Sequence, residues 1–209
     1  MTLIIIIFYY IIIPLIIGLI ARFIYLICNR GVVMKNNVQC AKTMIVLGSG
    51  GHTTEMFKIL NNLNINKYKP RIYVRGHTDK MSESKIAEFE SCNNDYKVIT
   101  IYRSRQVGQS YLSSIVTTLI AFLNAFVIIF NEKPDLILSN GPGTCVPLCL
   151  VAFIFKLFYL SNTIVIFVES FCRVKSLSLT GKILYFFADH VILQWPFICK
   201  QNSHVHVVN

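Results

Sequence analysis

The stretch VLGSGGHTTEM, residues 46–56, places three glycines and a histidine between an apolar run and a helical pattern. Glycines at such a turn permit close approach of the backbone to a ligand, and the free N–H groups of the following helix suit an anion. The pattern is neither GxGxxG in register nor a P-loop, because no GK[ST] follows. It predicts either an anion site or a plain strand-to-helix turn. The loop residues expected to contact an anion are Gly48, Ser49, Gly50, Gly51 and Thr53.

His52 and Glu55 add titratable groups to the same turn. His52 is expected at the N-cap of the helix, where an imidazole can act as general base towards a sugar hydroxyl, donate to a phosphate, or merely cap the helix. Glu55 falls in the first helical turn, where a carboxylate suits the helix dipole. It is expected to play only that role, to orient His52, or to meet a sugar hydroxyl.

A second glycine-rich turn, NGPGT, precedes another helical pattern at residues 140–144. Two such turns on neighbouring strands are suited to grip the two phosphates of a diphosphate. The residues expected to bind from this turn are Asn140, Gly141, Gly143 and Thr144. Arg103, Arg105 and Arg173 follow other strand patterns and are expected either to add charge-assisted hydrogen bonds or to remain exposed cations.

Glu169 ends an apolar run, which is an unusual place for a carboxylate. A carboxylate buried there needs a partner, and Arg173 or Lys175 can supply one. Two interpretations of Glu169 therefore stay open, a structural ion pair and a contact with the ligand.

Behind residue 42 the chain alternates short strand patterns with helical ones, which predicts a Rossmann-like α/β domain with one parallel sheet covered on both faces. The expected strands are residues 43–47, 71–75, 96–102, 135–139, 164–169 and 190–195. The expected helices are residues 53–63, 81–92, 110–130, 146–160 and 179–188. Parallel strands end at one edge of a sheet, so the glycine turns, the arginines and Glu169 all fall at that edge. This concentration of polar residues is the strongest sign of a binding site.

Two of these helical patterns are unusually apolar. Residues 115–130 contain only Asn124 as a strongly polar side chain and are short for a segment that spans a bilayer. A buried crossover helix is favoured, with a helix lying on a membrane face as the alternative. Residues 146–160, interrupted by Lys156, allow the same two interpretations.

Residues 3–21 form an uncharged apolar stretch long enough to span a bilayer as a helix. A signal peptide is disfavoured, because no basic segment precedes the stretch and no small-residue cleavage site follows it. Basic residues follow at Arg22, Arg30, Lys35 and Lys42, so the positive-inside rule predicts a single-pass protein whose domain faces the cytosol. The expected organisation is a transmembrane anchor at 1–28, a tether at 29–42 and one Rossmann-like domain at 43–209.

Charge and composition restrict the partners. The chain has 209 residues, a formal net charge of +10 and a sequence pI of about 9.3. No nucleic-acid motif is present and the aromatic residues stand in apolar runs, so a membrane surface or a phosphate-bearing ligand is favoured over nucleic acid. The seven cysteines show no CxxC pair and match reduced cytosolic thiols. No His and Cys positions pair at the spacing of a zinc site, so we expect no bound metal.

With these loops in order, the chain resembles the membrane subunits of the two-chain UDP-N-acetylglucosamine transferase of the dolichol pathway. The resemblance covers nearly all of residues 1–196 and includes the N-terminal span. The matching segments are GSGGHTTEM at 48–56, RSRQVGQS at 103–110, SNGPGT at 139–144 and FVESFCRVKSLSLTGKILYFFADHVILQWP at 167–196. The last two motifs are specific, whereas the glycine loop alone is not.

The resemblance implies the N-terminal, acceptor-binding half of a GT-B glycosyltransferase split into two chains. It is similar to the bacterial enzyme that adds N-acetylglucosamine to the lipid-linked peptidoglycan precursor. The implied protein sits in the endoplasmic reticulum membrane and recruits a soluble catalytic subunit that binds UDP-N-acetylglucosamine. It presents dolichyl-diphosphate-N-acetylglucosamine for addition of the second sugar, and is inactive alone.

The resemblance also implies roles for single residues. It implies two catalytic residues, His52 as the base for the attacking hydroxyl and Glu169, which lies near the catalytic cleft. The implied mechanism needs no metal and no cofactor. The short tail at 204–209 is expected to help bind the soluble subunit, for which strand addition is one route.

Three alternatives remain open. The chain is a scaffold that recruits its partner without a catalytic group, a subunit of a bacterial-type capsule glycosyltransferase, or an unrelated membrane-bound dinucleotide-binding protein. The N-terminal span weighs against the second. The third requires an acidic residue at the end of the strand at 71–75, where the chain has Arg75, Gly76 and His77, with Asp79 as the nearest acid.

Overall fold

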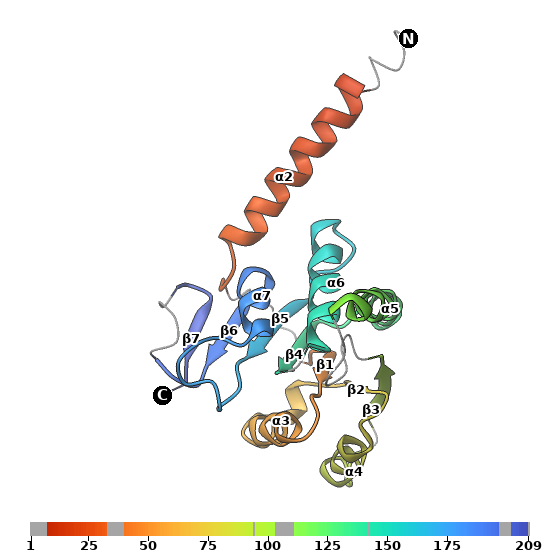
Figure 1. The fold of residues 1–209 in the computed structure, drawn as a ribbon, viewed down its shortest axis with the longest axis vertical. Helices are drawn as coiled ribbons and strands as arrows, with labels where there is room; N and C mark the ends of the chain where they lie inside the picture. The colour runs from red at the N-terminus through yellow and green to blue at the C-terminus, as the bar shows by residue number, and fades with distance from the viewer. Residues whose placement is uncertain are drawn as a thin grey trace.

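A single parallel sheet forms the centre of the domain, with helices against both faces (Figure 1). The computed structural model describes residues 8–32, 40–93, 95–102, 111–141, 143–196 and 202–208. Within these residues the sheet has seven strands in the order β3-β2-β1-β4-β5-β6-β7, with every neighbouring pair parallel. The strands are β1 Thr43–Val46, β2 Arg71–Gly76, β3 Tyr96–Ile101, β4 Leu136–Asn140, β5 Ile164–Val168, β6 His190–Leu193 and β7 Val205–Val207. The predicted Rossmann-like sheet is confirmed.

The helices divide between the two faces of the sheet. They are η1 Phe8–Ile12, α2 Ile13–Cys28, α3 Gly51–Asn61, η2 Ile65–Lys67, α4 Lys80–Phe89, α5 Tyr111–Glu132, α6 Cys145–Leu157 and α7 Leu179–Phe187. α3 and α4 cover one face, and α5, α6 and α7 cover the other (Figure 1). Each helix and strand predicted behind residue 42 is present, with ends that differ from the prediction by at most three residues.

Two hydrophobic clusters fill the space between the sheet and its helix layers. Met44 and Val46 of β1 belong to the cluster under α5, α6 and α7, whereas Ile45 and Leu47 belong to the cluster under α3 and α4. Successive side chains of a strand point to opposite faces, so both clusters draw on the same short run. Because both faces are covered, the strands are continuous apolar runs rather than alternating ones.

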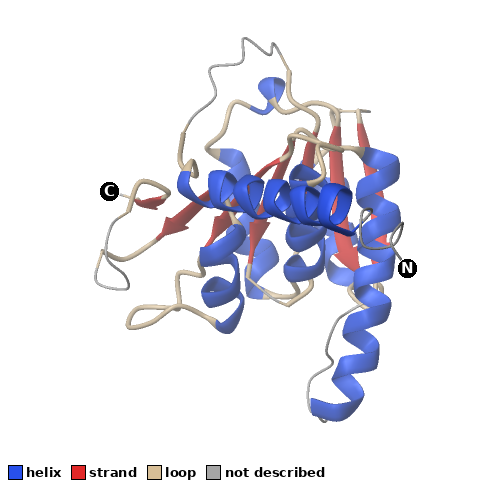
Figure 2. Ribbon diagram, turned by 90° about the horizontal axis from the view of Figure 1, so that it is seen from above, coloured by secondary structure: helices blue, strands red, loops and turns tan. Residues whose placement is uncertain are grey.

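The strand order reverses between β1 and β4. β2 and β3 lie on one side of β1, and α5 carries the chain back so that β4 pairs with the other side. In parallel α/β sheets, ligands bind at the carboxyl ends of the strands beside such a switch point. Figure 2 shows the arrowheads of the strands at one common edge, where the loops after β1, β4 and β5 meet.

The C-terminal tail adds a strand that the helical and strand patterns did not include. Val205 and Val207 of β7 pair in parallel with Val191 and Leu193 of β6. β7 is therefore the last strand of the sheet, and one of its edges is already used within the chain. The predicted contribution of this tail to binding the soluble subunit stays a prediction.

The two apolar helices predicted at 115–130 and 146–160 differ in how far they are buried. α6 is a buried crossover helix, as predicted, with most of its side chains in the core. The same prediction is wrong for α5, which buries Ala121, Ala125 and Ile129 but exposes large apolar side chains on its other side. A helix that is apolar all round gives no sign of which side the sheet will leave uncovered.

α2 projects from the domain on the side of the face that α5, α6 and α7 cover (Figure 1). None of its side chains is buried. Among the described residues, two helical stretches are long and apolar enough to cross a membrane, Tyr9–Cys28 and Ile115–Glu132. The first agrees with the predicted N-terminal span.

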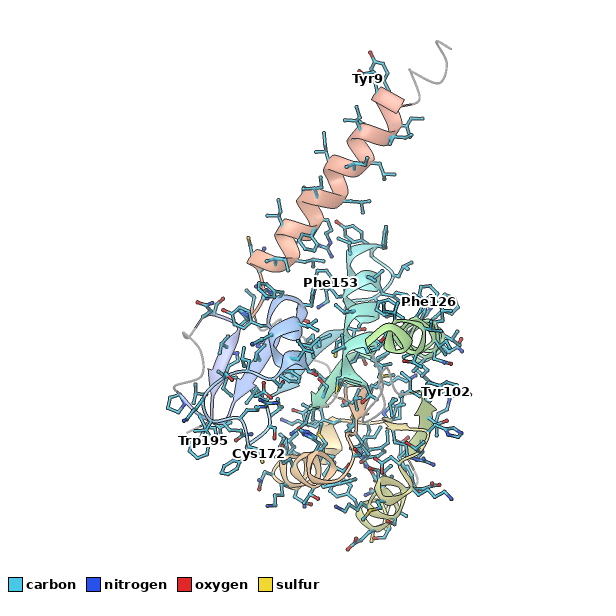
Figure 3. The ribbon with its side chains drawn as sticks, viewed as in Figure 1. Tyr9, Tyr102, Phe126, Phe153, Cys172 and Trp195 are labelled. Carbon is cyan, nitrogen blue, oxygen red and sulfur yellow. The ribbon has the colours of Figure 1, made fainter. Side chains whose placement is uncertain are left out.

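The end of α2 is fixed to the domain by aromatic contacts. The ring of Phe23 meets Phe153 of α6 edge-on at 5.8 Å, and Figure 3 shows Phe153 between the end of α2 and the body of the domain. The Arg22 guanidinium lies 4.1 Å from the centre of the Tyr159 ring. These contacts give α2 a defined exit from the domain.

A buried ion pair closes the amino-terminal end of β2. Nε and Nη2 of Arg71 each donate to the Glu90 carboxylate at 2.5 Å, and both side chains are fully buried. The Tyr73 hydroxyl donates to the same carboxylate at 2.6 Å. Burial, followed by the bond to Glu90, raises the pKa of Tyr73. The three groups satisfy one another at the end of the sheet opposite the polar loops.

Candidate functional site

An open cavity of about 620 Å³ lies at the carboxyl ends of the strands, among α3, the turn after β4 and the segment between β5 and α7. Its lining includes Gly51, His52, Gly141, Glu169 and Arg173. These five are all residues that the sequence predicted for the site. Three segments that are far apart in the sequence therefore meet at the carboxyl edge of the sheet, as the parallel topology predicts.

Gly50 forms the turn between β1 and α3. Its φ of 64° lies in the left-handed region, where a side chain is strained. Gly50 takes the N-cap position and the helix begins at Gly51, so His52 is the second helical residue rather than the predicted N-cap. Gly48 is buried, whereas Ser49 and Gly50 are exposed. The glycine-rich turn thus places the histidine two positions after the N-cap.

Thr53 stabilises this turn through hydrogen bonds of its buried side chain. Its side chain is buried, its hydroxyl donates to the Gly48 carbonyl, and it lies 2.8 Å from the Ser82 hydroxyl. Ser82 in turn donates to the carboxylate of Asp79, which caps α4. Thr53 is therefore a residue that holds the loop, and its predicted contact with an anion stays a prediction. Asp79 is already engaged, which disfavours a ribose contact there.

A chain of hydrogen bonds joins three loops at the cavity. Asn140, the last residue of β4, is buried and donates through Nδ2 to Glu55 Oε2 at 3.1 Å. Its Oδ1 lies 3.0 Å from Nδ1 of His52. The Ser170 hydroxyl donates to Glu55 Oε1 at 3.0 Å. Glu55 therefore ties α3 to the ends of β4 and β5.

The direction of these bonds determines which His52 nitrogen carries the proton. Because the Asn140 amide donates to Glu55, its Oδ1 must accept from Nδ1 of His52. A neutral imidazole protonated at Nδ1 keeps its lone pair on Nε2. The His52 side chain is 33% exposed and lines the cavity, so a ligand can reach the ring. This arrangement suits a general base acting through Nε2.

Gly141 makes room for this histidine. Its φ is 90°, and a Cβ at this position would overlap the imidazole of His52. A glycine is required both by the backbone conformation and by the close approach of the ring. The turn after β4 thereby forms one wall against which the imidazole packs.

Thr144 carries an unsatisfied hydroxyl in the same turn. It occupies the N-cap of α6 without a side-chain capping bond. Within the described part of the chain, its Oγ1 is buried and has no hydrogen-bond partner. An unpaired buried hydroxyl is costly, so an oxygen of a bound ligand would relieve it. Gly143 precedes it, and the prediction that both contact a ligand stays untested.

Glu169 is fully buried and accepts three hydrogen bonds. The donors are the Ser170 N–H at 3.0 Å, the Ser178 N–H at 2.9 Å and the Ser178 hydroxyl at 3.0 Å. An ion pair with Arg173 or Lys175, one of the two interpretations left open, is absent from the described residues, and both cations are exposed. Backbone and hydroxyl donors satisfy the carboxylate. The two cations remain in water and therefore pay no desolvation penalty.

The three predicted arginines have different outcomes. Arg173 is exposed, lines the cavity, and is held through its N–H, which donates to the Ser170 carbonyl at 3.0 Å. Arg103 and Arg105 lie outside the described residues, so their contacts with a diphosphate stay predictions.

Ser170 and Ser178 belong to the site although the sequence did not predict them. Ser178 caps α7 by accepting from the Gly181 N–H, and a serine before an apolar helical run is a recognisable capping signal. Ser170 bonds to Glu55 across 115 positions of sequence, and no local pattern reports such a contact. Among the described residues, no three His, Cys, Asp or Glu side chains are grouped as a metal site requires.

A parallel sheet with glycine turns and a histidine at its switch point defines a Rossmann-like domain of the kind that forms half of a GT-B fold. The crystal structure of MurG from Acinetobacter baumannii has a similar fold, with a TM-score of 0.58 and 17% identity. The match covers 79% of this chain and 45% of the MurG chain. At this identity the likeness shows the fold alone.

The sequence comparisons are more specific. Residues 43–208 match the family described as oligosaccharide biosynthesis protein Alg14 like. The UDP-N-acetylglucosamine transferase subunit ALG14 of Homo sapiens is 45% identical over 73% of this chain and 74% of its own length. The subunits of the same name from Yarrowia lipolytica and Schizosaccharomyces pombe are 42% and 40% identical, over 77% and 79% of this chain and 76% and 80% of their own lengths. The chain belongs to the Alg14-like family.

Proposed function

We propose that the chain is the membrane-anchored, acceptor-binding subunit of a UDP-N-acetylglucosamine transferase. It presents dolichyl-diphosphate-N-acetylglucosamine for transfer of the second N-acetylglucosamine in lipid-linked oligosaccharide synthesis. The observation that carries the proposal is the hydrogen-bonded chain of His52, Asn140 and Glu55 at the wall of a 620 Å³ cavity, in a member of the Alg14-like family. The names of its relatives support the choice of sugar donor.

In this proposal His52 Nε2 removes the proton from an acceptor hydroxyl as the hydroxyl oxygen attacks the anomeric carbon of the donor sugar. The bond between the sugar and UDP breaks, and UDP leaves with the electron pair. Glu55 acts through Asn140 and is a positioning residue. Glu169, for which the family resemblance implied a catalytic role, is proposed to act through the segment at 170–178 that it holds.

The diphosphate of the acceptor is proposed to lie between the N-termini of α3 and α6. Helix N-termini favour anions, and the two turns follow adjacent strands. The unpaired Thr144 hydroxyl and the exposed Arg173 support this placement, as does the net charge of +10. The residues proposed to bind are Gly48, Ser49, Gly50, Gly51, Thr53, Arg103, Arg105, Asn140, Gly141, Gly143, Thr144 and Arg173.

The donor is proposed to bind mainly to a separate soluble subunit. A GT-B enzyme combines two Rossmann-like domains, whereas the described residues form one such sheet and match 45% of the MurG chain. We therefore expect no transferase activity from this chain alone. Catalysis in this proposal uses the imidazole and requires neither a metal nor a cofactor.

α2 is proposed to anchor the domain at the cytosolic face of the endoplasmic reticulum membrane, as a single-pass protein. Its apolar stretch and the basic residues after it support this orientation. The division of the chain into an anchor at 1–28, a tether at 29–42 and a domain at 43–209 is part of the same proposal. Such an anchor holds the domain beside a lipid acceptor that stays in the bilayer.

The proposal is tested by reconstitution in detergent. The chain is combined with UDP-N-acetylglucosamine and dolichyl-diphosphate-N-acetylglucosamine, with and without the matching soluble subunit, and sugar transfer is measured. We expect transfer only when both chains are present. A stable complex of the two chains that transfers no sugar to this acceptor would overturn the acceptor assignment.

A further inference from the structure

An apolar stripe runs along the outer side of α5. Its large side chains include Ile115, Leu119, Leu123, Phe126 and Phe130, each more than 40% exposed. Spacings of three and four residues bring them onto one side of the helix. Monomeric soluble proteins rarely leave so continuous an apolar surface in water. A protein partner or a lipid surface is therefore expected to cover the stripe.

The stripe is distinct from the side of α5 that packs in the core. Ala121, Ala125 and Ile129 are buried against the domain. At the border of the stripe, the rings of Phe126 and Phe130 meet Phe155 of α6 edge-on, with centroids 5.0 and 6.4 Å apart. α5 thus has one apolar side for the core and a second that the described residues leave uncovered.

The ends of α5 are connected to the central sheet. α5 connects β3 to β4, which belong to the same sheet. At its C-terminal end, Glu132 pairs with Lys42 at 3.3 Å and with Lys97. Although Ile115–Glu132 is long and apolar enough to cross a bilayer, crossing would carry these charged contacts and a sheet edge into hydrocarbon. The connection therefore excludes a spanning α5.

α2 indicates the level of the membrane surface. Arg22 is the first charged side chain after the apolar stretch, and its guanidinium lies over the ring of Tyr159 at the end of α6. Tyrosine and arginine are favoured at membrane–water interfaces. Phe158 and Leu160 beside Tyr159 are also exposed. The end of α6 therefore belongs at the level of the lipid headgroups.

α5 lies on the same side of the domain as this end of α6. α2 leaves the domain on the face covered by α5, α6 and α7, and in Figure 1 it runs within the plane of the picture while α5 is seen end-on. Figure 2 shows α2 crosswise to α5. A helix that crosses the direction of the spanning helix runs along the membrane plane.

From these observations we infer that α5 is an interfacial helix. Its apolar stripe lies in the leaflet on the domain's side of the membrane that α2 spans, about 5–10 Å into the boundary between headgroups and acyl chains. Figure 2 shows α5 continuing beyond the carboxyl ends of the strands, so the leaflet runs past the edge where the 620 Å³ cavity opens. The inference rests on the proposed membrane anchor α2 and is independent of the proposed sugar transfer.

Fluorescence quenching by brominated lipids tests this inference. The full chain is reconstituted into phosphatidylcholine vesicles whose acyl chains carry bromine near the headgroup, in the middle, or near the methyl end. Leu123→Trp reports from the centre of the stripe, and Leu119→Trp repeats the measurement one turn away. Lys58→Trp on the exposed side of α3 is the matched control, and the parent chain corrects for Trp195.

We expect Leu123→Trp and Leu119→Trp to be quenched most strongly by bromine near the headgroup and Lys58→Trp to be quenched by none of the lipids. Strongest quenching of Leu123→Trp by bromine at the methyl end would mean that α5 spans the bilayer. Quenching no stronger than in Lys58→Trp would mean that water or protein covers the stripe. Either result would overturn the inference. Because both leucines are exposed, neither substitution disturbs the core.

Discussion

Two hydrogen-bonded carboxylates lie at opposite ends of the same sheet and differ in what can reach them. At the amino-terminal end, Glu90 and Arg71 are fully buried and satisfy each other. At the carboxyl end, Glu55 and His52 are joined through Asn140, but their side chains are 23% and 33% exposed. The two networks contain a similar number of hydrogen bonds, but only the one at the carboxyl end can be reached from solvent.

This difference separates a structural network from a chemical one. A sealed network holds the fold and exchanges nothing with a ligand. An open network in which the described residues leave one ring nitrogen of His52 without a partner can take up a proton from a ligand. Changes in the first network should therefore appear in unfolding, and changes in the second in sugar transfer.

The largest expected effect is on stability. Glu90→Gln should lower the free energy of unfolding by about 3–5 kcal/mol, because the Arg71 charge stays buried without its partner. Denaturant titration of the full chain in detergent measures the loss. Glu83→Gln removes the exposed partner of Arg75 and should cost less than about 1 kcal/mol. Equal losses in the two variants would contradict the structural role of the buried pair.

The largest expected effect on activity comes from His52→Ala. We expect transfer by the two-chain complex to fall by about a hundredfold or more, with the melting temperature and complex formation retained. His77→Ala changes an exposed histidine at the end of β2 and should leave transfer within about twofold of the parent, as is usual for surface substitutions away from a site. A His52→Ala complex with the parent rate would favour the scaffold alternative.

Gly141→Ala should affect both properties moderately. The strained backbone and the overlap with the imidazole should cost about 1–3 kcal/mol of stability. Displacement of the His52 ring should also lower transfer. Gly18→Ala in α2, where an added Cβ meets nothing within 4 Å, is the control for both measurements. Parent activity in Gly141→Ala would show that the packing of His52 on this turn is unimportant.

The smallest expected effect is a pH dependence away from both networks. Burial, followed by nearby His206, lowers the pKa of His190, and burial, followed by Arg30, lowers that of His204. The unfolded chain therefore binds more protons than the folded chain as the pH falls below about 6.5, so stability is full above that pH and declines below it. Thermal melts of His190→Gln should show a weaker decline. An unchanged decline would exclude His190 as its source.

Much of the fold was predictable because its signals are local. Continuous apolar runs such as the one at 43–47 alternate with longer helical patterns, and that rhythm implies a parallel sheet. A parallel sheet has one carboxyl edge, so His52, Gly141 and Glu169 could be assigned to a common site before their contacts were known. The predicted N-cap, His52, lies two residues after the observed cap, because only the backbone conformation of Gly50 identifies the cap.

The remaining features depend on contacts between distant segments. Asn140 and Glu55 bond across 85 positions, and Glu169 finds its donors in Ser170 and Ser178 rather than in a cation. α5 is apolar on both its packed and its exposed side, so its pattern could not show which side the core uses. Such features follow from tertiary packing, which cannot be predicted from the periodicity of apolar residues in the sequence.

The proposal that Glu55 acts through His52 is tested most directly by a double-mutant cycle. Sugar transfer is measured for the parent complex, Glu55→Gln, His52→Ala and the double variant under the same conditions. We predict that Glu55→Gln alone lowers the rate by about tenfold, and that it has no further effect once His52 is absent, because residues that act as a unit are not additive. The same tenfold loss in the His52→Ala background would contradict the proposal and assign Glu55 a separate role.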